Sequence, residues 1–234
     1  MTSQKEKFKT YARVFDQFTI RNLFKLSSQG HFDELKSPLF MGKESLVFSA
    51  LKKDGSHVLV KIHRLETANF KRLYEYIRYD KRFKGLSGHH RKVIFAWAQR
   101  EYRNLLKARE AGVTVPTPYT FMHNILVMEF IGDDGDPAPT VKIQKPKDPK
   151  EFFIKVLSDL RKLYKAGLVH GDLSEYNILN WKENPVFIDL SHTTTIDSSN
   201  AQRLLERDLT NVARYFNKLG VKTTIEEIKK KITR

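Results

Sequence analysis

Cysteine is absent from this sequence of 234 residues. Without thiols the chain can form neither disulfide bonds nor thiolate metal sites, and it has no cysteine nucleophile. Long hydrophobic runs are missing too, because no stretch approaches the roughly 18 apolar residues that a membrane-spanning helix needs. The first residues, MTSQKEKFKTYARVF, lack the apolar centre of a signal peptide. We therefore expect a cytoplasmic protein without a membrane partner.

Acidic residues are outnumbered by basic ones. The chain has 42 Lys and Arg against 27 Asp and Glu, which gives a net charge of +15. Between residues 61 and 110 the count is 14 basic residues against 5 acidic ones, a net charge of +9. Such a field attracts nucleic acid, nucleotide phosphates or an anionic membrane, but a solvated basic surface has the same composition. Charge alone does not choose between these interpretations.

The hydrophobic pattern changes from strand-like to helical along the chain. Apolar spacing predicts two helices within residues 5–30, and Pro38 is expected to break the chain after them. Strands are predicted over residues 45–51 and 57–62, a helix over 93–111, a helix that begins after Asp148-Pro149, and another over about 199–219. We expect an N-terminal helical extension over residues 1–40, a first lobe over 41–131 with a mobile basic loop at 80–92, and a second lobe over 132–234.

Two charged residues stand where apolar ones are expected. Glu101 lies on the apolar face of the helix over 93–111, in line with Ile94, Trp97 and Leu105. Lys61 lies in the alternating strand VLVKI. Because a buried charge must be paired, we predict that these two residues form an ion pair. In kinases such a pair directs the lysine toward the α- and β-phosphates of ATP.

The strongest motif is His170-Gly-Asp172-Leu-Ser-Glu-Tyr-Asn177, followed by Asp189 after an apolar strand. Phosphoryl transfer needs one carboxylate to accept a hydroxyl proton, and Asp172 suits this task. It also needs oxygen ligands for Mg²⁺, for which Asn177 and Asp189 are candidates. Asp189 is in addition a candidate phosphoryl acceptor, since carboxylates can form such intermediates. The competing interpretation is a loop in which Asp and Asn only cap turns.

These motifs together resemble those of the RIO family of atypical serine protein kinases, and specifically an archaeal-like member of its first subfamily. The stretches that carry the resemblance are Gly42-Lys43-Glu44, Ala96–Leu105, Pro137–Pro139, His170–Asn177 and Arg207–Asn211. The family pattern has Ser-Thr before Gly-Lys-Glu, whereas this chain has Phe40-Met41 and so lacks those two hydroxyl groups. A protein kinase of the usual kind would have a G-x-G-x-x-G loop, of which only Gly42 is present.

The resemblance implies an α+β, two-lobed minimal protein-kinase-like fold that uses ATP and Mg²⁺, with Mn²⁺ as a substitute. Asp172 would be the catalytic base, and Asn177 and Asp189 would hold the metal. The residues expected to bind ATP are Gly42, Lys43, Glu44, Val47, Lys61, Glu101, Met128, Glu129, Ile131, Leu179 and Ile188. The strand that contains Met128 and Glu129 looks like a kinase hinge, although an ordinary strand followed by a glycine turn would have the same pattern.

The resemblance also implies partners: a protein substrate, including the kinase itself, and the precursor small ribosomal subunit or its rRNA. We expect a monomer. The basic loop offers Ser87 as an autophosphorylation site, and its cations are candidates for contacts with rRNA phosphates: Lys81, Arg82, Lys84, Arg91 and Lys92. The alternative is that these charges serve only solubility.

Three other functions remain open. Small-molecule kinases such as aminoglycoside or choline kinases share the H-G-D-x-x-x-x-N motif, but they usually carry a larger helical lobe. A kinase of the tRNA-threonylcarbamoylation complex is similar in size and matches the Trp97 helix poorly. An assembly factor that uses ATP as a conformational switch would have the same fold. We further suggest that Asp208 accepts backbone N–H groups at His170-Gly171; the alternative is a surface acid paired with Arg207.

Overall fold

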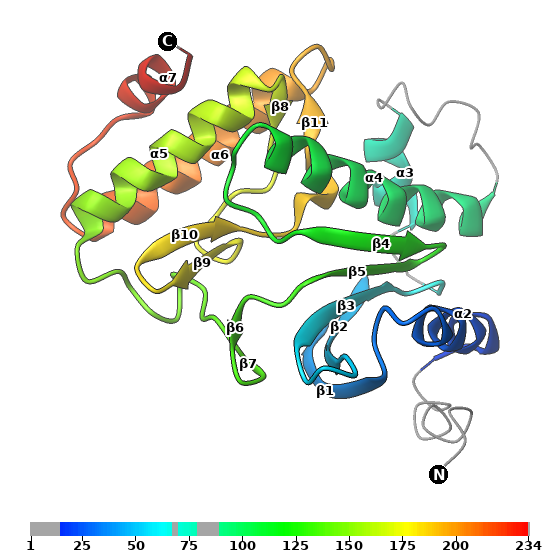
Figure 1. Cartoon of the computed structure of the whole chain (residues 1–234). Helices are drawn as coiled ribbons and strands as arrows, with labels where there is room; N and C mark the ends of the chain where they lie inside the picture. The colour runs from blue at the N-terminus through cyan, green and yellow to red at the C-terminus, as the bar shows by residue number, and fades with distance from the viewer. Residues whose placement is uncertain (1–14, 67–69, 79–88, 234) are drawn as a thin grey trace. The chain divides into compact units, whose positions relative to one another are not determined.

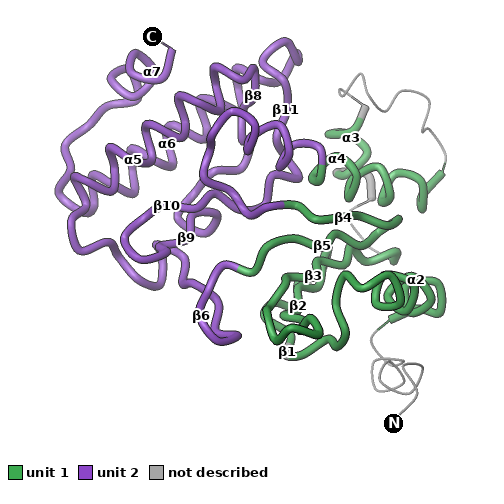
Figure 2. Tube along the Cα trace, in the orientation of Figure 1, with its two compact units in different colours: residues 1–77, 85–102, 118–130 green, residues 78–84, 103–117, 131–234 purple. Residues whose placement is uncertain are grey.

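A computed structural model describes residues 15–66, 70–78 and 89–233. The chain divides into two compact units (Figure 2). The described part of the first unit comprises residues 15–66, 70–77, 89–102 and 118–130, and that of the second comprises residues 78, 103–117 and 131–233. The segment 103–117, which we placed in the first lobe, belongs to the second unit, and the boundary falls within one helix after Tyr102.

An antiparallel five-stranded sheet forms the centre of the first unit (Figure 1). Its strands are β1 (Glu34–Met41), β2 (Ser45–Leu51), β3 (His57–His63), β4 (Pro118–Met122) and β5 (Ile125–Glu129), in the spatial order β1-β2-β3-β5-β4. The strands predicted at 45–51 and 57–62 are confirmed. Gly55 allows the tight turn between them, because its φ of 82° is one that residues with a Cβ rarely adopt.

Strand β1 contradicts the expected helical extension over residues 1–40. Its residues 34–41 pair with β2, and Pro38 lies inside the strand rather than ending the chain's regular structure. Proline cannot donate to a sheet, but β1 is an edge strand and its register shifts on both sides of Pro38. Proline is tolerated in edge strands and at bulges, where no hydrogen bond of the sheet needs its missing N–H.

The two faces of the sheet pack against different helices. Helix α2 (Gln17–Ser28), capped by Asp16, packs Leu23 and Leu26 into a core with Val58, Val60 and other strand residues. Side chains alternate along a strand, so Lys61 and His63 lie on the opposite face, where they meet α4 (His90–Glu110). Helix α3 (Phe70–Arg78) completes the described helices of this unit, and residues 1–14 of the predicted N-terminal helices lie outside the described residues.

Helix α4 begins earlier than expected. It starts at His90, so Arg91 and Lys92 lie in its first turn and not in the predicted loop. Apolar periodicity did not reveal this turn, because His90, Arg91 and Lys92 are all exposed and polar. The remainder of the predicted loop, residues 80–88 with Ser87, lies outside the described residues.

The described part of the second unit contains the end of α4 and the helices α5 (Pro149–Lys165), α6 (Ala201–Lys218) and α7 (Ile225–Thr233), and α7 packs on both α5 and α6 (Figure 1). Helix α5 begins as predicted, because the Asp148 carboxylate accepts the N–H groups of Lys150 and Glu151. Three two-stranded sheets flank the loops of the described part of this unit: β6 (Gly132–Asp133) with β7 (Asp136–Pro137), β8 (Leu168–Val169) with β11 (Thr194–Thr195), and β9 (Ile178–Trp181) with β10 (Asn184–Phe187). No helix within the described ranges is long and apolar enough to cross a membrane.

Candidate functional site

The predicted ion pair is present in the first unit. Lys61 Nζ lies 2.8 Å from Glu101 Oε1, and the two side chains are only 8% and 1% exposed. The lysine is opposite Val47 of β2 and Leu126 of β5, which fixes its place in the middle of the sheet. In a pair this deeply buried, removing either residue would leave the other without its charged partner.

His63 is a neighbour of this pair that the sequence analysis missed. It follows Lys61 by two residues on the same face of β3, and its Nε2 lies 3.4 Å from Glu101 Oε2 without hydrogen-bond geometry. Asn124 fixes the backbone of His63: its carbonyl accepts the His63 N–H at 2.8 Å, and its Nδ2 donates to the His63 carbonyl at 2.8 Å. The i, i+2 spacing from Lys61 is the only sequence signal for this residue.

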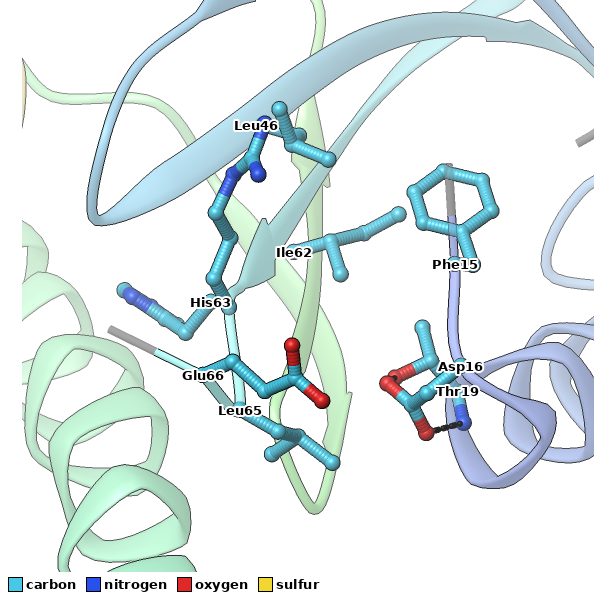
Figure 3. A pocket seen from close by; sticks show the side chains of 9 residues that line it. Phe15, Asp16, Thr19, Leu46, Ile62, His63, Leu65 and Glu66 are labelled. Carbon is cyan, nitrogen blue, oxygen red and sulfur yellow. Dashed lines mark hydrogen bonds between the residues drawn. The ribbon is translucent and has the colours of Figure 1, made fainter. Parts of the chain in front are cut away.

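A cavity of about 280 Å³ lies beside His63, between the start of α2 and the end of β3 (Figure 3). Phe15, Leu46 and Ile62 give it an apolar side, and Asp16 and His63 contribute polar groups. Asp16 is engaged as the cap of α2, since it accepts both the N–H and the hydroxyl of Thr19. None of the residues predicted to bind ATP lines this cavity.

The turn that contains Gly42 joins β1 to β2. Gly42 N–H donates to the Ser45 carbonyl at 2.9 Å, and the Glu44 carbonyl accepts the N–H of Arg64 at 2.9 Å. A Cβ on Gly42 would lie 2.5 Å from the ring of Phe40, so a side chain at this position would force that ring to move. Phe40 and Met41 are both exposed, so apolar side chains stand where the family pattern has hydroxyl groups.

Other residues predicted to bind ATP lie in both units. In the first unit Met128 and Glu129 end β5, paired with Leu59 and Val58 of β3. In the second unit Ile131, Leu179 and Ile188 pack together in one apolar cluster with Ala138 and Val186. Three of the predicted contacts therefore share a single apolar surface.

Asp172 lies on a loop whose backbone forms hydrogen bonds with the side chains of Asn177, Arg207 and Asp208. Its carboxylate is 43% exposed, which leaves it accessible to a substrate. Asn177 Nδ2 donates to the Asp172 carbonyl at 2.8 Å and lies 3.4 Å from Oδ2. Arg207 Nη2 contacts Asp172 Oδ1 at 3.2 Å and also donates to the carbonyl of Gly171.

Asp208 is the buried anchor of this loop. Its Oδ2 accepts the N–H of Gly171 at 2.7 Å and its Oδ1 accepts the N–H of Leu173 at 2.8 Å, so it holds the residues on both sides of Asp172. The contact with Gly171 is the one we suggested, but the second N–H belongs to Leu173 and not to His170. The alternative of a surface acid is wrong because Asp208 is 1% exposed. Burial raises the pKa of Asp208 from 3.8 to about 7, although the two N–H donors and Arg207 act in the opposite direction.

The same face of α6 contributes further contacts. Asn211 Nδ2 donates to the Leu173 carbonyl at 3.0 Å, so Arg207, Asp208 and Asn211 all hold one loop. The loop requires glycine at position 171 for two reasons. The φ of Gly171 is 81°, and a Cβ there would lie 2.6 Å from the carbonyl oxygen of His192. The sequence shows this face as an i, i+1, i+4 set of polar residues, but the contacts of Arg207 and Asn211 were not predicted.

Asp189 is placed by a separate set of contacts. Its backbone is left-handed, with φ 58° and ψ 64°, and Ser191 Oγ donates to its Oδ1 at 2.6 Å. The Ile188 N–H donates to the Asn177 carbonyl at 3.1 Å, which ties the two predicted metal ligands together. Asn104, another residue that the sequence analysis missed, donates to the carbonyls of Leu190 and Thr193 and so fixes the segment after Asp189.

The donor set suits Mg²⁺. The amide nitrogen of Asn177 donates to the Asp172 carbonyl, so its amide oxygen is the atom that could bind the ion. Asp189 would supply a carboxylate oxygen. Within the described ranges no group of three or more His, Cys, Asp and Glu could enclose a metal ion. Mg²⁺ bound to a nucleotide does not need such a cage, because it takes one or two protein ligands together with phosphate oxygens and water.

The sequence and the fold are similar to those of known proteins. A family model described as the RIO domain matches residues 46–229. RIO-type serine/threonine-protein kinases named Rio1 are 38% identical in Haloferax volcanii, over 92% of this chain and 74% of the relative, and 38% identical in Methanocaldococcus jannaschii, over 97% and 78%. The human serine/threonine-protein kinase RIO1 is 32% identical over 94% of this chain, which spans only 40% of that protein.

Solved structures of the Rio2 kinase from Chaetomium thermophilum have the same fold. An ADP/Mg²⁺-phosphoaspartate complex matches with a TM-score of 0.70 and 22% identity, over 91% of this chain and 66% of the Rio2 chain. Another Rio2 structure gives the same TM-score at 23% identity, over 89% and 66%. The match confirms the predicted kinase-like class, with an antiparallel sheet in one part and helices in the other. The chain therefore belongs to the RIO family of serine/threonine-protein kinases.

Proposed function

We propose that this chain transfers the γ-phosphoryl group of ATP to a serine or threonine hydroxyl of a protein substrate, including itself. The observation that carries the proposal is the arrangement at Asp172, an accessible carboxylate on a loop whose backbone is fixed by the buried Asp208. An accessible carboxylate can accept the proton of an incoming hydroxyl, and a fixed backbone keeps it oriented. The buried pair of Lys61 and Glu101 gives further support.

Each remaining residue has a role in this proposal. Lys61, held by Glu101, binds the α- and β-phosphate oxygens, and Asn177 and Asp189 would hold Mg²⁺, which neutralises phosphate charge when it is bound. The apolar cluster of Ile131, Leu179 and Ile188 contacts the adenine ring, as does the end of β5. Six further residues are assigned to ATP: Met128, Glu129, Gly42, Lys43, Glu44 and Val47.

Asp189 is proposed as a second phosphoryl acceptor, which would give the enzyme ATPase activity. A carboxylate oxygen attacks the γ-phosphorus, the bond to ADP breaks, and ADP leaves with the electron pair. Water then hydrolyses the phosphoaspartate and releases phosphate. The Rio2 kinase crystallised as an ADP/Mg²⁺-phosphoaspartate complex supports this proposal for a relative. In this chain Ser191 at 2.6 Å fixes the orientation of the Asp189 carboxylate.

Two substitutions test the division of roles. We expect Asp172→Asn to lower phosphoryl transfer to a protein substrate by about 10²–10⁴-fold, with ATP affinity nearly unchanged, because this carboxylate acts on the hydroxyl. We expect Asp189→Asn to weaken Mg-ATP binding and to remove phosphate release in the absence of substrate. Radiolabelled transfer, phosphate release and nucleotide affinity are measured separately, with the exposed Asp136→Asn as the control. Equal loss of ATP affinity in both site variants would refute this assignment.

We further propose that the protein acts in the cytoplasm, as a monomer, on the precursor small ribosomal subunit. The net charge of +15 supports a polyanionic partner such as rRNA. A switch that uses ATP mainly to change conformation differs from a protein kinase in what stimulates turnover. ATP hydrolysis that rises with precursor particles but not with protein substrate would favour the switch, and phosphate transfer to protein would favour the kinase.

A further inference from the structure

The second unit contains a groove that is lined by residues outside the catalytic loop at 170–177. It has a volume of about 560 Å³ and lies along the first turns of α5, the segment after α6, and helix α7. α7 packs on α5, so the groove is formed by two helices that are in contact (Figure 1). None of the residues assigned to ATP, the metal or the phosphoryl acceptor lines it.

The groove has an apolar floor. Phe153 and Val221 line it and are themselves buried. Ile154 also lines it and is 66% exposed, whereas its neighbours on α5, Phe152 and Val156, are buried. An exposed isoleucine beside buried apolar side chains offers a contact surface for one aliphatic side chain of a partner.

The rim of the groove is positively charged. It contains Lys150, Lys222, Lys230 and Lys231, and no ion pair to any of them occurs among the residues that the structure describes. The single acid of the lining, Glu227, forms hydrogen bonds with Thr224, the residue before α7. Its carboxylate accepts the Thr224 N–H at 3.0 Å, while Thr224 Oγ1 accepts the Glu227 N–H at 3.2 Å. The lining therefore holds four lysines against one glutamate, and none of the four forms an ion pair among the described residues.

Helix stability explains only part of this charge. Lys230 and Lys231 lie in the last turn of α7, where cations interact favourably with the helix dipole. Lys150 lies in the first turn of α5, where the dipole disfavours a cation, and Lys222 lies outside any helix. A negatively charged partner accounts for all four.

We propose that this groove is a docking surface for an acidic peptide segment that carries one aliphatic side chain. The aliphatic side chain packs on Ile154 between Phe153 and Val221, and carboxylates on either side of it meet the lysines of the rim. A single-stranded RNA fits less well, because it is bound by exposed aromatic rings on which bases stack, and the one ring that lines the groove is buried. The inference does not rest on the proposed phosphoryl transfer.

The test uses the full chain and a fluorescein-labelled peptide of alternating Glu and Ser with one central Leu. We expect saturable binding that weakens with salt, and a triple variant, Lys222→Ala with Lys230→Ala and Lys231→Ala, that binds about tenfold more weakly. Ile154→Ser should weaken binding about threefold or more. Replacing the peptide's Leu with Gly should weaken binding to the wild type by a similar factor.

Matched controls separate the groove from general charge and from folding. Lys53→Ala with Lys145→Ala and Lys165→Ala removes three exposed lysines outside the groove, and Ile143→Ser removes an isoleucine that is 79% exposed elsewhere. Thermal unfolding and ATP turnover of all variants should match those of the wild type. Equal losses in groove and control variants, or no saturable binding, would overturn the proposal. Tighter binding of an oligouridine through the same lysines would assign the groove to RNA and overturn it as well.

Discussion

Lys61 and Glu101 depend on each other, because burial makes either one costly alone. Both are nine-tenths buried or more, at an Nζ–Oε1 distance of 2.8 Å. We expect Lys61→Met and Glu101→Gln each to lower the free energy of unfolding by about 3–5 kcal/mol, since each leaves an unpaired buried group. The double variant should lose far less than the sum. Urea denaturation followed by circular dichroism measures this coupling.

The exposed pair of Lys182 and Asp133 provides a matched control. Its atoms are 3.2 Å apart and its side chains are about two-thirds exposed, so its coupling should stay below about 1 kcal/mol. A coupling between Lys61 and Glu101 no larger than in this control would show that the pair does not act as a unit. The helix that carries Glu101 would then have no demonstrated link to the lysine.

This ion pair could be predicted because each residue conflicts with its own local pattern. A lysine in an apolar strand and a glutamate on an apolar helix face each need a partner of opposite charge, and each can be that partner for the other. His63 raises no such conflict, since a histidine at the end of a strand is unremarkable by itself. Its approach to Glu101 at 3.4 Å depends on where α4 lies on the sheet. That position is decided by packing and cannot be found from sequence spacing.

At the scale of elements, α6 acts as a support for the catalytic loop. Asp208 accepts two backbone N–H groups on either side of Asp172. In Asp208→Asn one acceptor oxygen becomes an amide that faces an N–H donor, so we expect a loss of about 1–3 kcal/mol in unfolding free energy. Phosphoryl transfer should fall with it, because Asp172 loses its fixed backbone. Asp136→Asn, in the exposed strand β7, should change neither quantity.

The pH dependence of stability gives a second readout of the same element. The pKa of Asp208 is about 7 in the folded protein and 3.8 when unfolded. Between these values the folded state binds more protons than the unfolded state, so this group's contribution to stability is greatest below about pH 4 and is lost as the pH rises through 7. The wild type should therefore lose stability relative to Asp208→Asn from pH 4 to pH 7. A constant difference across this range would contradict the raised pKa.

Elements with regular periodicity were the ones that could be predicted. The core strands, the cap at Asp148 and the apolar line of α4 all follow from local patterns. Strand β1 did not, because Pro38 reads as a break unless one knows that the strand lies at an edge. The start of α4 was missed for a related reason. Exposed first turns have no apolar period, so only the backbone reveals them.

For the whole molecule, the excess of positive charge is the feature that a small nucleotide site does not explain. The net charge is +15, and +9 of it is concentrated between residues 61 and 110. Arg91 and Lys92 stand in the first turn of α4, which contains no acid, although the helix dipole disfavours cations there. Arg91 lies over the ring of Phe18 at 5.9 Å, and both cations are exposed. An anionic partner accounts for cations placed at the unfavourable end of a helix.

We therefore predict that Arg91 and Lys92, with Lys81, Arg82 and Lys84 of the preceding segment, bind rRNA phosphates. Affinity for small-subunit RNA should fall steeply with salt, and replacing these five residues with Ala should reduce the slope of log K against log [salt] by about 3–5, because each neutralised phosphate releases counterions. Phosphorylation of Ser87 would add about −1.5 to −2 charge among these cations and should weaken binding in the same way. The triple variant at Lys222, Lys230 and Lys231 is a control, since removing these groove lysines should leave the slope nearly unchanged if RNA binds at α4. An unchanged slope in the five-residue variant would leave these cations as solvated surface.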